Sequence, residues 1–94
     1  MFLGAYHFDG DPAALLPAYD RLKVQYPPEA LDLHVCVVHE GGLTVLDACP
    51  SRSEFEDFSS GPDFAAALAY AGLPTPKVAP LGDVHSALLR SPVA

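Results

Sequence analysis

The sequence predicts an α+β domain whose strands and helices follow one another in the order β-α-β-β-α-β. Three observations support this fold class. A Gly41-Gly42 pair joins two runs rich in β-branched residues, which is typical of a β-hairpin. The other apolar runs are either short, as in strands, or repeat at helical spacing. The chain has 94 residues, half of them hydrophobic, which suits one domain with its own core.

The first part of the chain is expected to form a strand and then a helix. Residues 2–8 (FLGAYHF) are apolar and aromatic and indicate the first strand. Asp11 is a suitable helix N-cap, and Pro12 suits the first helical position. Pro17 predicts a kink, or a helix that becomes regular only after it, and Pro27-Pro28 ends the helix. The apolar side chains share one helical face: Leu15, Ala18, Tyr19, Leu22 and Tyr26.

The hairpin strands are expected at residues 31–39 and 43–49. If Gly41 and Gly42 are the central residues of a type I′ turn, the register pairs His34 with Cys49. One face of the hairpin then carries only apolar side chains, and we interpret it as a core face: Val35, Val37, Leu46 and Ala48. The opposite face is mixed: His34, Cys36, Asp47 and Cys49, flanked by Val38 and Val45.

A second helical region follows the hairpin and is expected to break in its middle. Residues 51–54 (SRSE) and 53–56 (SEFE) both match a capping box. Gly61-Pro62 ends the first helix and starts the next one. Gly72 fits the left-handed position that ends a helix.

The last strand is expected over residues 77–88, and Pro80 and Gly82 within it favour an edge position or a bulge. Residues 91–94 are expected to be a frayed tail, so that one domain covers residues 1–90. The element order is that of a ferredoxin-like split βαβ fold, with a four-stranded antiparallel sheet of order 4-1-3-2 and both helices on one face. A second copy of the chain is the common cover for the other face, so we expect a homodimer.

The composition excludes several classes of partner. Five Lys and Arg residues stand against twelve Asp and Glu residues, a formal net charge of −7. This acidity argues against nucleic acid and against an anionic membrane surface. There is no export signal and no long apolar run, so we expect a cytoplasmic protein. The chain lacks dinucleotide and phosphate-binding motifs, and we expect no cofactor.

His34 and Asp47 form the first candidate catalytic pair. A carboxylate orients an imidazole that acts as a base near neutral pH, and Asp47 lies diagonal to His34 in the predicted register. The alternative is a hydrogen-bonded pair in a dimer interface. Cys36 and Cys49 add metal-ligand residue types. Neighbours on one strand lie ~7 Å apart, however, so we interpret both cysteines as small buried hydrophobic residues and expect no metal.

His7 and Tyr6, near the end of the first strand, complete the candidate catalytic set. In this hypothesis His or Asp moves a proton and Tyr positions the ligand. Tyr6 and Tyr19 are the best candidates for the lining of a pocket, because each hydroxyl needs a partner. The histidines are expected to divide between the two ends of the sheet: His7 with His39, and His34 with His85.

Four segments together resemble the dimeric α/β-barrel superfamily. They are FLGAYHF, the Gly-Gly hairpin, SRSEFEDFSSGPDFAAALAYAGLP and VAPLGDVHSAL. The nearest resemblance is to small proteins of high-GC bacteria. A more distant one is to antibiotic-biosynthesis monooxygenases, polyketide cyclases, muconolactone isomerases and stress-responsive barrel proteins.

This resemblance implies a homodimer with a pocket between sheet and helices. It also implies cofactor-free acid–base or oxygen chemistry on an aromatic or polyketide-like small molecule. The chain has no Trp, in contrast to monooxygenase sites that use one, and no catalytic residue transfers one for one. The alternative is a non-catalytic dimer that binds a ligand or a protein partner, with the polar sheet face as its interface.

Overall fold

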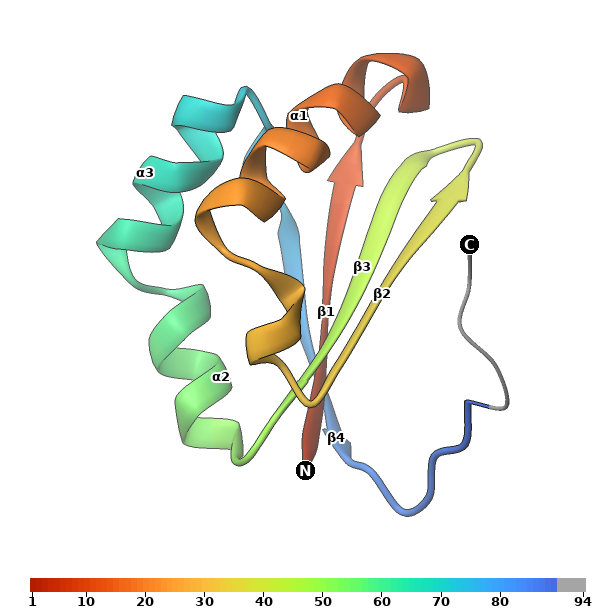
Figure 1. The fold of residues 1–94 in the computed structure, drawn as a ribbon, viewed down its shortest axis with the longest axis vertical. Coiled ribbons are helices and arrows are strands. Elements are labelled where there is room, and N and C mark those ends of the chain that lie inside the picture. Colours follow the sequence, from red (N-terminus) through yellow and green to blue (C-terminus); the bar gives the residue numbers. More distant parts are fainter. Residues whose placement is uncertain (90–94) are drawn as a thin grey trace.

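The computed structural model describes residues 1–89, which form an α+β unit (Figure 1). The expected tail at residues 91–94 lies outside this range. A short 3-10 turn at Pro28–Ala30 separates the first helix from the second strand. The strands and helices are β1 (Phe2–Asp9), α1 (Pro12–Gln25), β2 (Leu33–His39), β3 (Gly42–Cys49), α2 (Arg52–Ser59), α3 (Pro62–Ala71) and β4 (Lys77–Asp83). None of these helices has the length and apolarity needed to cross a membrane.

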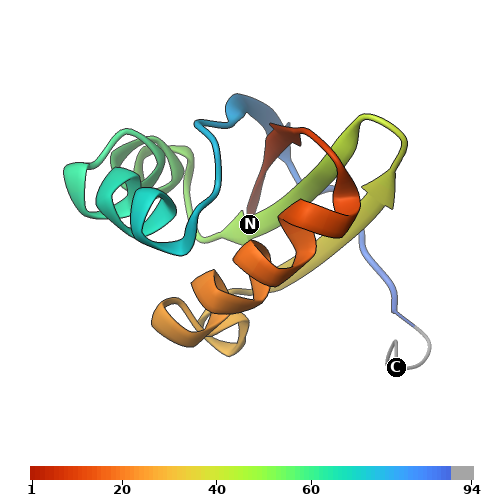
Figure 2. The ribbon, with the colours of Figure 1, turned by 90° about the horizontal axis from the view of Figure 1, so that it is seen from above.

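The four strands form an antiparallel sheet in the order β2-β3-β1-β4, which is 4-1-3-2 when read from the β4 edge. The helices cover the same face of the sheet, as two perpendicular views show (Figures 1 and 2). β2 and β4 are the edge strands, so the sheet of the single chain is open rather than closed into a barrel.

Local signals in the sequence explain where the helices begin and end. The Asp11 carboxylate accepts a backbone N–H of the first turn of α1 at 3.0 Å. α1 continues through Pro17 as one helix. Of the two possible capping sites before α2, the Ser51 hydroxyl accepts a backbone N–H at 3.3 Å. Gly72 adopts a left-handed conformation with φ +90°, and the buried Leu73 follows it, as the sequence predicts for the end of α3.

The turn of the hairpin is not the predicted one. Glu40 and Gly41 connect the strands, and Gly42 already belongs to β3, where it pairs with His39. A type I′ turn needs positive φ at both central residues, and Glu40 does not have it. Gly42 has φ +138°, and a Cβ there would lie 1.9 Å from the carbonyl oxygen of Phe8. A glycine is therefore needed at this position for the close approach of β1, and not for the turn.

The interpretation of Val35, Val37, Leu46 and Ala48 as the core face of the hairpin is wrong for the single chain. Val35 and Val37 are 38% and 42% exposed on the uncovered face of the sheet, although Ala48 is fully buried there. The mixed face, which carries His34, packs against the helices instead. Both faces have the same two-residue period, so alternation alone does not identify the face that the helices cover.

The core lies between the sheet and the helices. Gly4 in β1 makes room for Phe55 of α2, because a Cβ at Gly4 would lie 2.0 Å from that ring. β4 is an edge strand with a register shift opposite Leu3 and Gly4, as its proline and glycine predicted, but it ends at Asp83 rather than at residue 88. The large buried side chains are Phe2, Tyr6, Phe8, Leu15, Tyr19, Leu43, Val45, Phe55, Phe64, Leu68 and Leu73.

Candidate functional site

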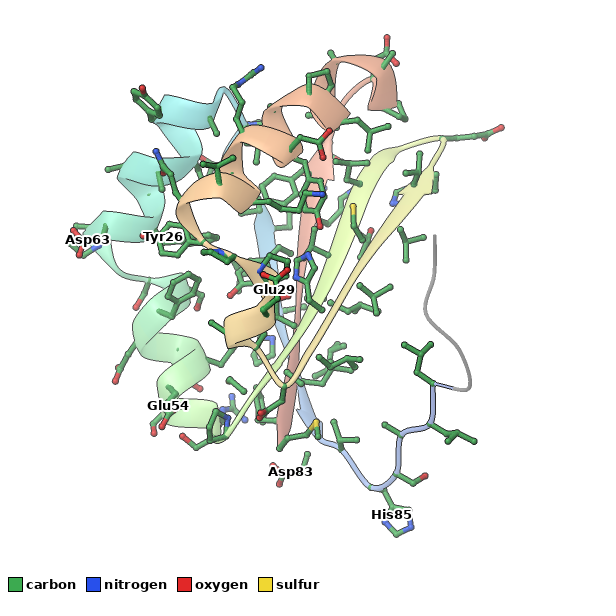
Figure 3. All side chains as sticks on the ribbon, viewed as in Figure 1. Tyr26, Glu29, Glu54, Asp63, Asp83 and His85 are labelled. Atoms are coloured by element: carbon green, nitrogen blue, oxygen red, sulfur yellow. The ribbon has the colours of Figure 1, made fainter. Side chains whose placement is uncertain are left out.

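A cavity of about 250 Å³ lies between the helices and the sheet. Strands β1, β2 and β3 form its floor, and α1, the 3-10 turn, α2 and α3 form its walls. Figure 3 shows Tyr26 at the end of α1 and Glu54 on α2, which contribute to two of these walls. The lining is mainly apolar and rich in aromatic rings: Tyr6, Phe8, Tyr19, Tyr26, Phe55, Phe58 and Phe64. Such a lining suits a flat, apolar ligand.

Three polar side chains in the cavity wall form a chain of hydrogen bonds. The Oη atom of Tyr19 lies 2.5 Å from Nε2 of His34, and Nδ1 of His34 lies 2.5 Å from Oδ1 of Asp47. The side chains of His34 and Asp47 are only 17% and 15% exposed. An ionised carboxylate only accepts hydrogen bonds, so Nδ1 carries a proton and donates to it. In neutral His34, Nε2 then accepts the hydroxyl proton of Tyr19.

The observed hairpin register creates this arrangement. His34 on β2 lies directly opposite Asp47 on β3, rather than diagonal to it as the sequence predicted. Directly opposed residues share one face of a sheet and are its closest side-chain neighbours. Tyr19 reaches His34 from α1, and the two rings are stacked at 5.9 Å with an angle of 3° between their planes.

Both buried tyrosines keep their protons at neutral pH. Burial raises the pKa of Tyr19 to about 12, and the nearby Cys36 and Asp47 add to this effect. Burial, followed by the Asp47 carboxylate, holds the pKa of Tyr6 well above the usual range of a phenol. Both hydroxyls are therefore available as hydrogen-bond donors.

Among the candidate residues, His34, Asp47 and Tyr6 all line the cavity. The structure does not bring His7 to them, because His7 precedes Phe8 and follows Tyr6, and those two residues point toward the helices. On the uncovered sheet face, Nε2 of His7 donates to Asp9 at 2.8 Å.

The remaining histidines lie outside the cavity. The ring of His39 stacks on that of His7 at 5.1 Å, and both rings bond to the Thr44 hydroxyl, so these two histidines share one end of the sheet as predicted. His85 is exposed on the segment after β4, away from the helices (Figure 3).

The two cysteines are free, and both are half-buried. Burial is the main cause that raises the pKa of each thiol, so neither Cys36 nor Cys49 is prepared as a thiolate nucleophile. Within residues 1–89, no three His, Cys, Asp or Glu side chains converge as metal ligands.

The sequence predicts that Tyr19 lines a pocket but does not predict its contact with His34. The available signal was its position on the apolar face of a helix, next to the buried Leu15 and Ala18. A hydroxyl on such a face needs a partner. The identity of that partner depends on the packing of α1 over β2, which no local pattern encodes.

Comparisons of the chain with protein-family models, with curated proteins and with solved structures gave no match. The likeness to the dimeric α/β-barrel superfamily therefore stays a prediction from the sequence. Function depends on the residues of the site rather than on the fold.

Proposed function

We propose that the protein binds a flat aromatic small molecule in the cavity and transfers a proton from it, with His34 as the base. The observation that carries this proposal is the Tyr19–His34–Asp47 chain in the wall of an aromatic cavity. In this role Asp47 fixes the orientation of the imidazole and stabilises the imidazolium that forms.

Tyr19 acts as a relay in this proposal because its hydroxyl occupies Nε2 of His34. As the acidic bond of the ligand breaks, its proton bonds to the Tyr19 oxygen. The former hydroxyl proton moves at the same time to Nε2. The net change is a ligand anion and a His34 imidazolium paired with Asp47, while Tyr19 remains a phenol. A phenol with a pKa of about 12 is suited to this role, since it does not ionise on its own at neutral pH.

Naphthol is a suitable probe for the proton transfer, because naphthol and naphtholate have different absorbance spectra. We expect naphthol bound to the wild-type protein to ionise at lower pH than free naphthol. His34→Gln removes the base and should abolish this shift, and Asp47→Asn should reduce it. Tyr70→Phe, which alters an 82% exposed residue outside the cavity, is the matched control.

Two outcomes decide between the candidate functions. If the His34 variant ionises bound naphthol as the wild type does, the proposed base is wrong. Binding without any change of ionisation in the wild type would favour the alternative, a non-catalytic ligand-binding protein.

We also propose that the chain is a ferredoxin-like unit that dimerises through the uncovered face of its sheet into an α/β barrel. The exposure of Val35 and Val37 on that face supports a second copy as its cover. Val37→Asp should convert the dimer to a monomer, as measured by light scattering after size-exclusion chromatography. Val24→Asp, at an 81% exposed position on α1, should not. A monomeric wild-type protein at micromolar concentration would contradict this proposal.

A further inference from the structure

We propose that Tyr6 recognises an oxygen atom on the ligand, so that the cavity selects phenols and aryl ketones over plain aromatic hydrocarbons. This inference rests on the proposed function, because it assigns the substrate class of the same cavity. It gives Tyr6 a role different from that of Tyr19.

The first observation concerns the hydrogen bonding of the Tyr6 hydroxyl. Tyr6 is only 3% exposed, and its hydroxyl forms no hydrogen bond with another side chain or backbone group in residues 1–89. Within the same range, no fully buried side-chain nitrogen or oxygen lacks a partner. The hydroxyl of Tyr6 therefore reaches accessible space, and the cavity that this residue lines provides it. A polar group held in an apolar cavity without a protein partner indicates a polar atom on the ligand.

The packing of the Tyr6 ring keeps the hydroxyl in this position. The ring lies 5.5 Å from that of Phe55 and 5.3 Å from that of Phe64, both in tilted contacts. On the sheet, Tyr6 pairs with Val45 on one side and Val78 on the other. A side chain that is packed between two helices and two strands cannot swing to the surface. Its donor is thus oriented before a ligand arrives.

Tyr6 and Tyr19 have different roles in the proposed reaction. The hydroxyl of Tyr19 is already hydrogen-bonded to His34, whereas that of Tyr6 has no partner among residues 1–89. Burial keeps the pKa of Tyr6 above the usual range, so this phenol keeps its proton and donates a hydrogen bond rather than ionising. As the ligand loses its proton to Tyr19 and Tyr19 passes its own proton to His34, negative charge develops on the ligand oxygen. A fixed donor aimed at that atom stabilises the charge.

The volume of the cavity determines which probe molecules are suitable for a test. At about 250 Å³ it lies below the usual range of small-molecule pockets, which favours a ligand of one or two rings. Naphthalene and naphthol share one ring system and differ only by a hydroxyl. Acetonaphthone carries a carbonyl, which accepts hydrogen bonds but does not donate them.

The experiment measures the dissociation constants of these three probes by fluorescence titration for wild type, Tyr6→Phe and the Tyr70→Phe control. We expect the wild type to bind naphthol and acetonaphthone more tightly than naphthalene. Tyr6→Phe should weaken both oxygenated probes about five- to tenfold and leave naphthalene unchanged. Thermal unfolding of Tyr6→Phe verifies that the loss of one hydroxyl leaves the fold intact.

Each other outcome has a distinct meaning. If all three probes bind wild type equally, or if Tyr6→Phe keeps the preference, the role of Tyr6 is overturned while the cavity proposal stands. A Tyr6→Phe effect on naphthol without one on acetonaphthone would overturn the assignment of Tyr6 as a donor. If none of the probes binds, the proposed function itself fails.

Discussion

A methyl group added at Gly4 should push Phe55 out of its place and so affect both stability and the cavity. A Cβ at this position would lie 2.0 Å from Cε1 and 2.1 Å from Cζ of Phe55. Ordinary carbon–carbon contacts are ~3.5–4.0 Å, so the ring has to retreat by roughly 1.5–2 Å. The rings of Phe2 and Tyr6, at 5.7 and 5.5 Å, limit that movement.

The size of the effect follows from two opposing contributions to the free energy of unfolding. Overpacking of this kind costs about 1–3 kcal/mol. Alanine in place of glycine in a strand returns about 0.5–1 kcal/mol through backbone entropy. We therefore expect Gly4→Ala to destabilise the protein by about 1 kcal/mol, and by no more than about 2.5 kcal/mol. In a domain of this length, each kcal/mol lowers the melting temperature by about 4–8 °C.

A double-mutant cycle measured by urea denaturation tests the assigned cause. Phe55→Ala removes all three ring atoms that approach the added methyl group, namely Cε1, Cζ and Cδ1 at 2.6 Å. In the Phe55→Ala background, Gly4→Ala should become neutral or stabilise by up to about 1 kcal/mol, because only the entropy contribution remains. An equal loss of stability from Gly4→Ala in both backgrounds would refute the steric reasoning. Phe55 lines the cavity, so Gly4→Ala alone should also weaken naphthalene binding.

Three further predictions concern single positions. Gly72→Ala should cost about 1–2 kcal/mol in urea denaturation without changing probe binding, because its φ of +90° strains any residue with a Cβ. Tyr19→Phe should remove a tyrosinate absorbance step near pH 12. The pKa of Tyr19 in the folded protein is raised above its unfolded value of 10.0, so the stability that Tyr19 contributes is complete below pH 10 and is lost toward pH 12. The free energy of unfolding of the variant should therefore fall less steeply between pH 10 and pH 12. Asp9→Asn should make unfolding less sensitive to acid. Hydrogen bonds from His7 and then Lys77 lower the pKa of Asp9. The stability that Asp9 contributes is therefore present above its unfolded pKa of 3.8 and is lost as the pH falls through the lower folded pKa. An unchanged acid profile of the variant would contradict this assignment.

The sequence predicts only part of the candidate site. The sequence predicts His34 and Asp47 as an acid–base pair and Tyr6 as a residue whose hydroxyl needs a partner, and all three line the cavity. His7 belongs to the same predicted set but lies on the opposite face of β1, where it bonds to Asp9. A residue type marks a side chain as unusual, whereas its face depends on which side of the sheet the helices occupy.

The sequence by itself determined the features that depend on near neighbours along the chain. It specified the order of strands and helices, the cap at Asp11 and the left-handed end of α3 at Gly72, and it limited the cap of α2 to Ser51 or Ser53. Each of these depends on interactions within a few residues, so a short pattern encodes it.

Only the tertiary structure decided the hairpin register, the covered face of the sheet and the partner of Tyr19. The sequence predicts Gly42 as a turn residue, but a glycine is needed there because the backbone of β1 approaches closely at Phe8. That contact moves the turn by one residue and places His34 opposite Asp47. The packing of α1 then brings the Tyr19 hydroxyl to His34. These contacts join segments that are distant in the sequence, and therefore no local pattern records them.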